Sequence, residues 1–195
     1  MNACKVLELA KSNDISKIIE MAKQEISEIA TKEKHGASNL KRFKLIVKYL
    51  KDAEKFNYKL GKVWTENNLQ CFASGCTAFL LKNHFEELPI SEESIINLHD
   101  CMRSAYTRQL IEFNIADVKA KLKIFKSEHK RSKDPCFYEL GESLYNAQYL
   151  IDCYTILGGE DIKFYIPKNG ELIPGIFENE NGKAIILPVK RNKNK

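Results

Sequence analysis

Residues 145–166, YNAQYLIDCYTILGGEDIKFYI, hold a helix signal, a stop signal and a strand signal in succession. The apolar residues before the glycines recur at helical spacing, which predicts a helix over residues 145–157. Gly158 and Gly159 can adopt the positive φ of a helix C-cap, so they end it. Alternating and apolar runs then predict three strands, over residues 161–167, 172–179 and 183–190.

The N-terminal half of the chain contains the same order of elements. Apolar spacing predicts a helix over residues 39–55, followed by three short strands over residues 58–65, 68–74 and 77–83. Another amphipathic helix is predicted over residues 14–30, with a polar linker containing Gly36 between the two helices. The sequence therefore predicts a helix followed by three strands in each half of the chain.

The region between the two units is predicted to add two helices and one strand. The first helix starts near Ser91, the second covers residues 115–130, and the strand covers residues 136–140. The predicted fold class is α+β, with duplicated units of one helix and an antiparallel strand meander. The expected division is an N-terminal helical extension (1–38), a main domain (39–190, with halves 39–82 and 136–190 and a helical insert 83–135) and a basic tail (191–195).

Composition places the chain among ordinary intracellular globular proteins. Its 195 residues are 44% hydrophobic and 29% charged, which suits one folded domain. No run reaches the roughly 20 apolar residues that span a bilayer, and no signal peptide is evident, so we expect a cytoplasmic protein without a membrane partner. The six cysteines lack paired metal-ligand spacing, and we expect them to be reduced and buried.

No constellation in the sequence predicts catalysis, a metal or another cofactor. The four histidines lie in different predicted elements, without a second ligand at metal spacing. The Gly158-Gly159 pair follows a helix rather than preceding one, so it does not form a phosphate-binding loop. We therefore expect a protein that is not an enzyme.

Lysines recur at equal intervals on two predicted helices, in a chain of net charge +5. Their spacing places them on one side of each helix, where point charges a turn apart suit phosphate contacts that ignore base sequence. The predicted DNA-binding residues on the first helix are Lys41, Arg42, Lys44, Lys48, Lys51 and Lys55. Those on the second helix are Lys119, Lys123, Lys126 and Lys130.

Both halves resemble parts of the bacterial DNA sliding clamp, the beta subunit of DNA polymerase III. The segments ELGESLYN, NAQYLIDCYTILG, DIKFYIPK, ELIPGIFENE and GKAIILPVK resemble the end of that family's chain. Residues at the family's motif positions are Asn146, Tyr149, Leu150, Leu157, Leu187, Pro188 and Val189, with Lys190 in place of an arginine. LKRFKLIVKYLKDA and LGKVWTENNLQCFASGCTAFLL resemble an earlier half, with Ser74 in place of an aspartate.

The resemblance implies a clamp-like, DNA-associated accessory protein of replication or repair, of a compact kind that would suit a phage or mobile element. It implies helices that face duplex DNA, and a cleft for polymerase or other replication proteins beside Leu187, Pro188 and Val189. Family members have three such domains and close into rings, whereas this chain has room for one. A ring would therefore require a homo-oligomer or a partner chain.

Two alternatives remain open at the level of sequence. Lysines are common on exposed helix faces, and the helix at residues 145–157 carries Asp152 but no basic residue. The alternative to DNA binding is a protein-interaction module that binds replication proteins without DNA. A separate alternative to the partner cleft is that Leu187 and Val189 are ordinary edge or core residues.

Overall fold

The structure, a computed structural model, describes residues 15–102, 108–130, 132, 134–158, 160–168 and 173–190, with residues 31–35 described by their backbone alone. The predicted basic tail and the first 14 residues lie outside this part. The helices are α2 (Ile15–Glu54), η1 (Tyr58–Gly61), α3 (Leu98–Met102), α4 (Ile115–Glu128) and α5 (Ala147–Leu157). The strands are β1 (Trp64–Glu66), β2 (Leu69–Ser74), β3 (Thr77–Leu81), β4 (Arg108–Ile111), β5 (Phe137–Leu140), β6 (Ser143–Asn146), β7 (Lys163–Pro167), β8 (Gly175–Asn179) and β9 (Gly182–Ile186).

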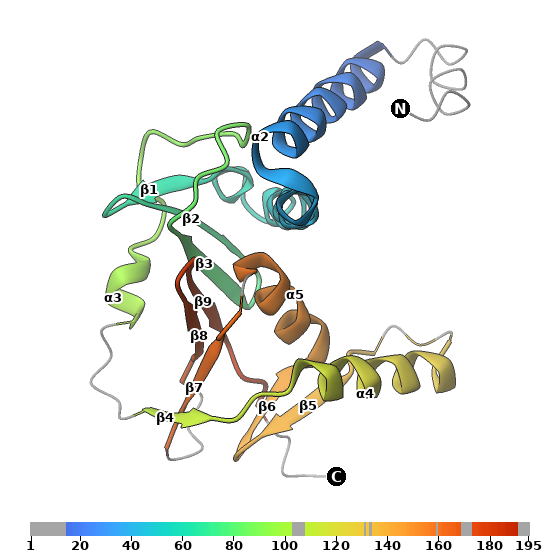
Figure 1. Ribbon diagram of the computed structural model, residues 1–195, viewed down its shortest axis with the longest axis vertical. Helices are drawn as coiled ribbons and strands as arrows, with labels where there is room; N and C mark the ends of the chain where they lie inside the picture. The colour runs from blue at the N-terminus through green and yellow to red at the C-terminus, as the bar shows by residue number, and fades with distance from the viewer. Residues whose placement is uncertain are drawn as a thin grey trace.

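The predicted α+β class is confirmed, and the two strand meanders meet in one antiparallel sheet. Its strand order is β1-β2-β3-β9-β8-β7-β4, so the third strand of each meander lies at the centre (Figure 1). There β3 pairs with β9, with Thr77 opposite Ile186 and Leu81 opposite Gly182. β5 and β6 form a separate two-stranded sheet.

Four phenylalanines and one alanine form a row across the middle of the large sheet. Directly opposed residues follow one another from β2 to β7, and they are Phe72, Phe79, Ala184, Phe177 and Phe164. All five are fully buried, and the rings stack within each meander, with centroids 4.6 Å apart for Phe72 and Phe79 and 4.2 Å for Phe164 and Phe177. Opposed residues point to the same side of a sheet, so this row fixes which side is the core. We call it the phenylalanine row.

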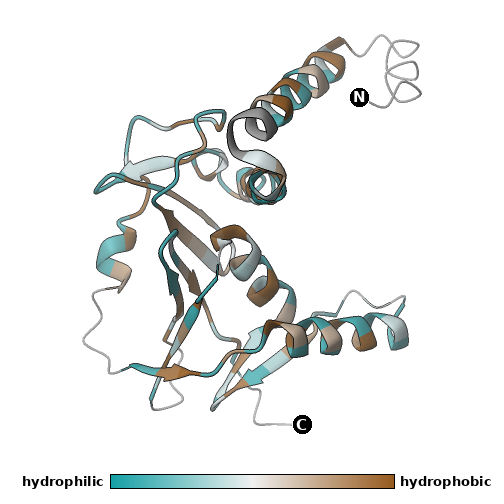
Figure 2. Ribbon diagram, in the orientation of Figure 1, coloured by the Kyte–Doolittle hydropathy of each residue, from teal (hydrophilic) through white to brown (hydrophobic). Residues whose placement is uncertain are grey.

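Helices α2 and α5 cover the side of the sheet that carries this row (Figure 1). Tyr49 of α2 meets the ring of Phe79 edge-on, with centroids 5.7 Å apart. The N-cap of α5 is Asn146, whose side chain accepts a hydrogen bond from the backbone of Gln148, and its C-cap is Gly158, with φ 60°. Figure 2 colours much of α5 and of the neighbouring strands brown, for hydrophobic residues. The predicted C-cap at Gly158 is therefore confirmed, while Gly159 lies outside the described residues.

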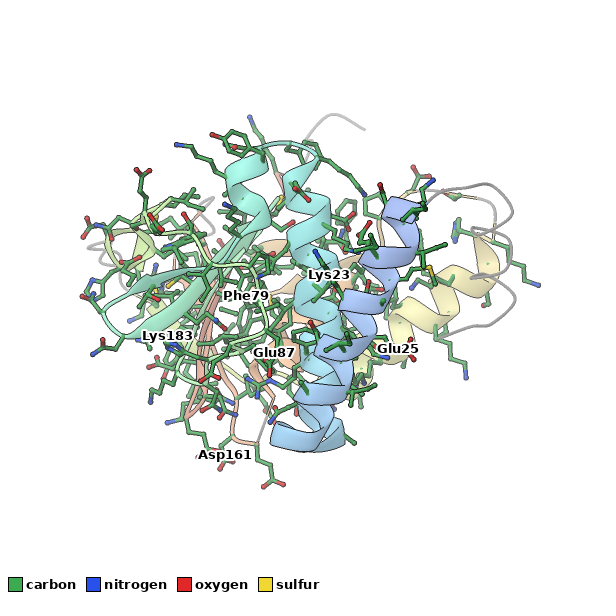
Figure 3. The ribbon with its side chains drawn as sticks, turned by 90° about the horizontal axis from the view of Figure 1, so that it is seen from above. Lys23, Glu25, Phe79, Glu87, Asp161 and Lys183 are labelled. Carbon is green, nitrogen blue, oxygen red and sulfur yellow. The ribbon has the colours of Figure 1, made fainter. Side chains whose placement is uncertain are left out.

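α2 consists of two helical segments separated at Gly36, where φ is 81° and ψ is 174°. The predicted linker between two helices is thus a single non-helical residue. The second segment (residues 37–54) packs on the sheet, and the first segment (residues 15–35) folds back beside it (Figure 3). Among the described side chains of the first segment, none is buried.

The region predicted to be a helical insert differs most from its prediction. Among the described residues of this region, only Leu98–Met102 is helical where a helix starting near Ser91 was expected, and β4 was not predicted. β4 pairs with β7 and extends the main sheet, with Ile111 opposite Phe164. α4 begins at Ile115 as predicted and is capped by the side chain of Asn114.

The tight turn between β8 and β9 generates a stability prediction. A Cβ atom on Gly182 would lie 2.1 Å from the carbonyl oxygen of Leu80, and φ there is 146°. Gly182→Ala should lower the free energy of unfolding by about 2–4 kcal/mol, measured by urea denaturation, because the β3–β9 pairing must give way. Gly75→Ala is the matched control, because φ is 57° there and a Cβ atom would have no neighbour within 4 Å. We expect it to lower the free energy of unfolding by about 1 kcal/mol. Equal losses would contradict this account.

Candidate nucleic-acid interface

Lysines from α2 and α4 converge on an open groove above the outer side of α5. The groove has a volume of about 420 Å³ and is lined by Lys41, Lys44, Leu45, Lys48, Lys119, Gln148, Ile151, Asp152 and Thr155. We call it the lysine groove. We call the predicted DNA-binding residues of each helix a lysine stripe. The groove takes Lys41, Lys44 and Lys48 from the stripe of α2 and Lys119 alone from the stripe of α4, because α4 packs against α5 and α5 packs against α2. Two helices that are distant in sequence therefore place ammonium groups around one depression.

The other predicted lysines lie on the surface in different surroundings. Lys51 and Lys55 are exposed and paired with acidic side chains, Lys51 with Glu20 at 2.9 Å and Lys55 with Asp52 at 2.6 Å. Lys126 is exposed and donates a hydrogen bond to Gln148 Oε1 at 3.1 Å, which ties α4 to α5. Lys123 and Lys130 are exposed, but they do not line the groove.

The floor of the lysine groove holds a buried carboxyl group. Asp152 is only 6% exposed; Tyr49 donates to its Oδ2 at 2.9 Å and Gln148 donates to its Oδ1 at 2.8 Å. Burial raises the pKa of Asp152, although these two hydrogen bonds and the nearby Lys48 and Lys126 act to lower it. The acidic residue that the sequence placed on this helix therefore points into the fold rather than toward a ligand in the groove.

Arg42 is buried, in contrast to its neighbours Lys41 and Lys44. Only 6% of it is exposed, its Nε donates to the carbonyl oxygen of Ile156 at 2.7 Å, and its Nη1 donates to Asn39 at 2.7 Å. Its guanidinium also lies over the ring of Phe85. The prediction that Arg42 contacts DNA is contradicted by this burial, since the side chain joins α2 to the end of α5.

The three residues predicted to border a partner cleft follow β9. Leu187 is 43% exposed, whereas Pro188 and Val189 are partly buried. The backbone of Val189 donates to the carbonyl oxygen of Leu144 at 2.7 Å, so this segment joins the main sheet to β6. Val189 thus stabilises the fold through its pairing with Leu144, and Leu187 lies at the surface.

Several contacts of the groove were not predicted from the sequence. Gln148 and Asp152 are one turn apart on α5, and this spacing in the sequence is a signal from which their hydrogen bond could be predicted. The ring of Tyr154 lies 6.0 Å from Lys119 Nζ, and Tyr49 reaches Asp152 across 103 sequence positions. Such contacts depend on how the helices pack, which local spacing does not reveal.

Other kinds of site find little support in the part of the chain that the structure describes. No group of three or more His, Cys, Asp or Glu side chains there is arranged to hold a metal ion. The five described cysteines are free; Cys71, Cys136 and Cys153 are buried as predicted, whereas Cys76 and Cys101 are exposed. None of the described helices combines the length and apolar character needed to cross a membrane.

Comparisons of this chain with protein-family models, with curated proteins and with solved structures found no match.

The burial of Arg42 predicts a structural role that can be measured. Arg42→Met should lower the free energy of unfolding by about 1–2 kcal/mol, because it leaves the buried carbonyl of Ile156 without its donor. Lys41→Met, the adjacent exposed position, is the matched control and should stay within about 0.5 kcal/mol of the parent protein in urea denaturation. Indistinguishable stabilities for the two variants would rule out this role.

The buried carboxyl group predicts a pH-dependent stability difference. Because burial raises the pKa of Asp152 above its ordinary 3.8, its ionisation opposes folding above the folded-state pKa. Asp152→Asn should therefore unfold at a higher temperature than the parent at pH 7, and the difference should shrink as the pH falls through that pKa toward 3.8. The same substitution at an exposed position, Asp161→Asn, serves as the control. A difference that stays constant with pH would contradict the assignment.

Proposed function

We propose that this chain is a non-enzymatic, clamp-like accessory protein of DNA replication or repair, which binds duplex DNA without sequence preference through the lysine groove. The convergence of Lys41, Lys44, Lys48 and Lys119 from two helices carries the proposal. Ammonium groups on flexible stems contact phosphates as point charges and read no base sequence. Such contacts suit a protein that must associate with any duplex.

The arrangement of the fold adds independent support. Each meander is preceded by a helix, both helices cover the same side of the sheet, and the third strands of the meanders adjoin at the centre. A helix followed by three strands in each half is the order that the resemblance to sliding clamps implies, and this order supports the proposal. Asp152, the acidic residue that weighed against phosphate binding on α5, accepts hydrogen bonds inside the fold and leaves the rim of the groove basic.

A titration across a salt series tests this function. Random-sequence duplex should bind measurably at about 50 mM salt, and log K should fall linearly with log salt concentration. Lys48→Gln with Lys119→Gln should weaken binding about tenfold and make that slope shallower by about 1.8, because each lysine that contacts a phosphate contributes about 0.9. Fluorescence anisotropy of labelled duplex measures both quantities.

The matched control removes the same charge from the opposite side of the sheet. Lys163 and Lys183 each precede a member of the phenylalanine row, so their side chains point away from the helices. Lys163→Gln with Lys183→Gln should leave affinity and slope nearly unchanged. Equal losses in the two double variants would show that total charge matters and the groove does not. No binding by the parent at low salt would refute the function.

A second candidate is a protein-interaction module that binds replication proteins without DNA. The observation in its favour is apolar surface: Ile15, Ile19, Ile26 and Ile29 of α2 are each about half exposed or more, at 63%, 49%, 67% and 51%. Leu187, predicted to border a partner cleft, is also exposed. The same titration separates the two candidates, since this module has no affinity for duplex DNA at any salt concentration.

A further inference from the structure

The first segment of α2 covers two lysines of the predicted DNA-binding stripe with its polar side. Lys44 forms an ion pair with Glu28 at 2.9 Å, and Lys51 forms one with Glu20 at 2.9 Å. Gln24 connects the two pairs, because its Oε1 accepts from Lys51 at 3.3 Å and its Nε2 donates to Glu28 at 3.1 Å. The hydrogen bond and charge of Lys51 hold the pKa of Glu20 below its ordinary value. Carboxylates thus occupy the ammonium groups that phosphates would contact.

A single non-helical residue, Gly36, connects this segment to the second segment of α2. φ of 81° favours glycine, and a Cβ atom there would meet nothing within 4 Å. The ion-paired residues lie at similar distances before and after Gly36, as in an antiparallel helical hairpin (Figure 3). One residue therefore sets the position of the first segment relative to the second.

Weak polar contacts, rather than a buried apolar interface, hold the first segment in place. Four of its five isoleucines are exposed and Ile18 is partly buried, and no described side chain of residues 15–30 belongs to the hydrophobic core. Exposed ion pairs each contribute only about 0–1 kcal/mol and weaken as salt rises. A duplex that offers many phosphates can therefore displace two carboxylates from this surface.

We propose that the first segment of α2 is a detachable cover, which competes with the DNA backbone for Lys44 and Lys51. This inference rests on the proposed function, since the cover regulates the same basic surface. Lys41, Lys48 and Lys119 remain available when the cover is closed, because they make no ion pair within the described chain. Opening the cover adds two lysines to that set. Closed and open forms therefore differ in how many phosphates they neutralise.

Neutralising the two carboxylates of the cover tests the inference on the full chain. Glu20→Gln with Glu28→Gln should raise affinity for random-sequence duplex about threefold to tenfold at low salt, because two competing ion pairs are lost. The slope of log K against log salt should become steeper by up to about 1.8, as Lys44 and Lys51 become available to phosphates. Anisotropy titrations with the parent protein run alongside give both changes.

The matched control adds the same charge far from the cover. Glu178 pairs with Lys183 at 3.1 Å on the sheet, and Glu180 is exposed in the following turn. Glu178→Gln with Glu180→Gln changes net charge equally and should leave the slope unchanged. If the cover variant binds no better than this control, the cover is refuted while duplex binding stands. If neither the parent nor any variant binds duplex, the proposed function and the cover both fall.

Discussion

The phenylalanine row is the contact on which the rest of this structure depends. Phe72 and Phe79 belong to one meander, Phe164 and Phe177 belong to the other, and Ala184 joins them at the central pairing. Stacked aromatic pairs add about 0.5–1.5 kcal/mol each beyond the burial of their area. The small side chain of Ala184 leaves room at the centre of the sheet, where α5 packs on β9. Two of the three helices that line the candidate site, α2 and α5, pack on the side of the sheet that carries this row.

The surface chemistry follows from how α2 is seated on that row. With Phe43, Ile46 and Leu50 buried, the helix must present Lys41, Lys44 and Lys48 on its other side. The periodicity that forms the core thereby aligns the ammonium groups. Arg42 falls between these two sides and is drawn into the fold, where its guanidinium meets a carbonyl oxygen left unpaired at the end of α5. Neighbouring basic residues on one helix thus differ completely in what they can contact.

Elements with strong local signals were predictable, and elements that depend on distant partners were not. Hydrophobic periodicity and capping residues identify α4, α5 and the second segment of α2, and the turns at Asn67-Asn68 and Asn181 separate the strands of the meanders. β4 escaped prediction because its sequence, RQLI, is short and its strand character comes from pairing with β7. The short α3 relies on Glu66, which accepts hydrogen bonds from the backbone of Leu98 and His99 across more than 30 positions. The lysine stripes could be predicted from spacing, whereas their convergence and the burial of Arg42 could not.

The pairing of β3 with β9 also determines the order in which the chain can complete its fold during synthesis. β3 ends at Leu81, but its partner strand is among the last described residues, and contacts such as Arg42 to Ile156 span 114 positions. Translation proceeds at about 5–20 residues per second, so the first meander spends several seconds near the ribosome with one edge unpaired. The nascent chain therefore exposes an aggregation-prone strand edge until β9 has been synthesised.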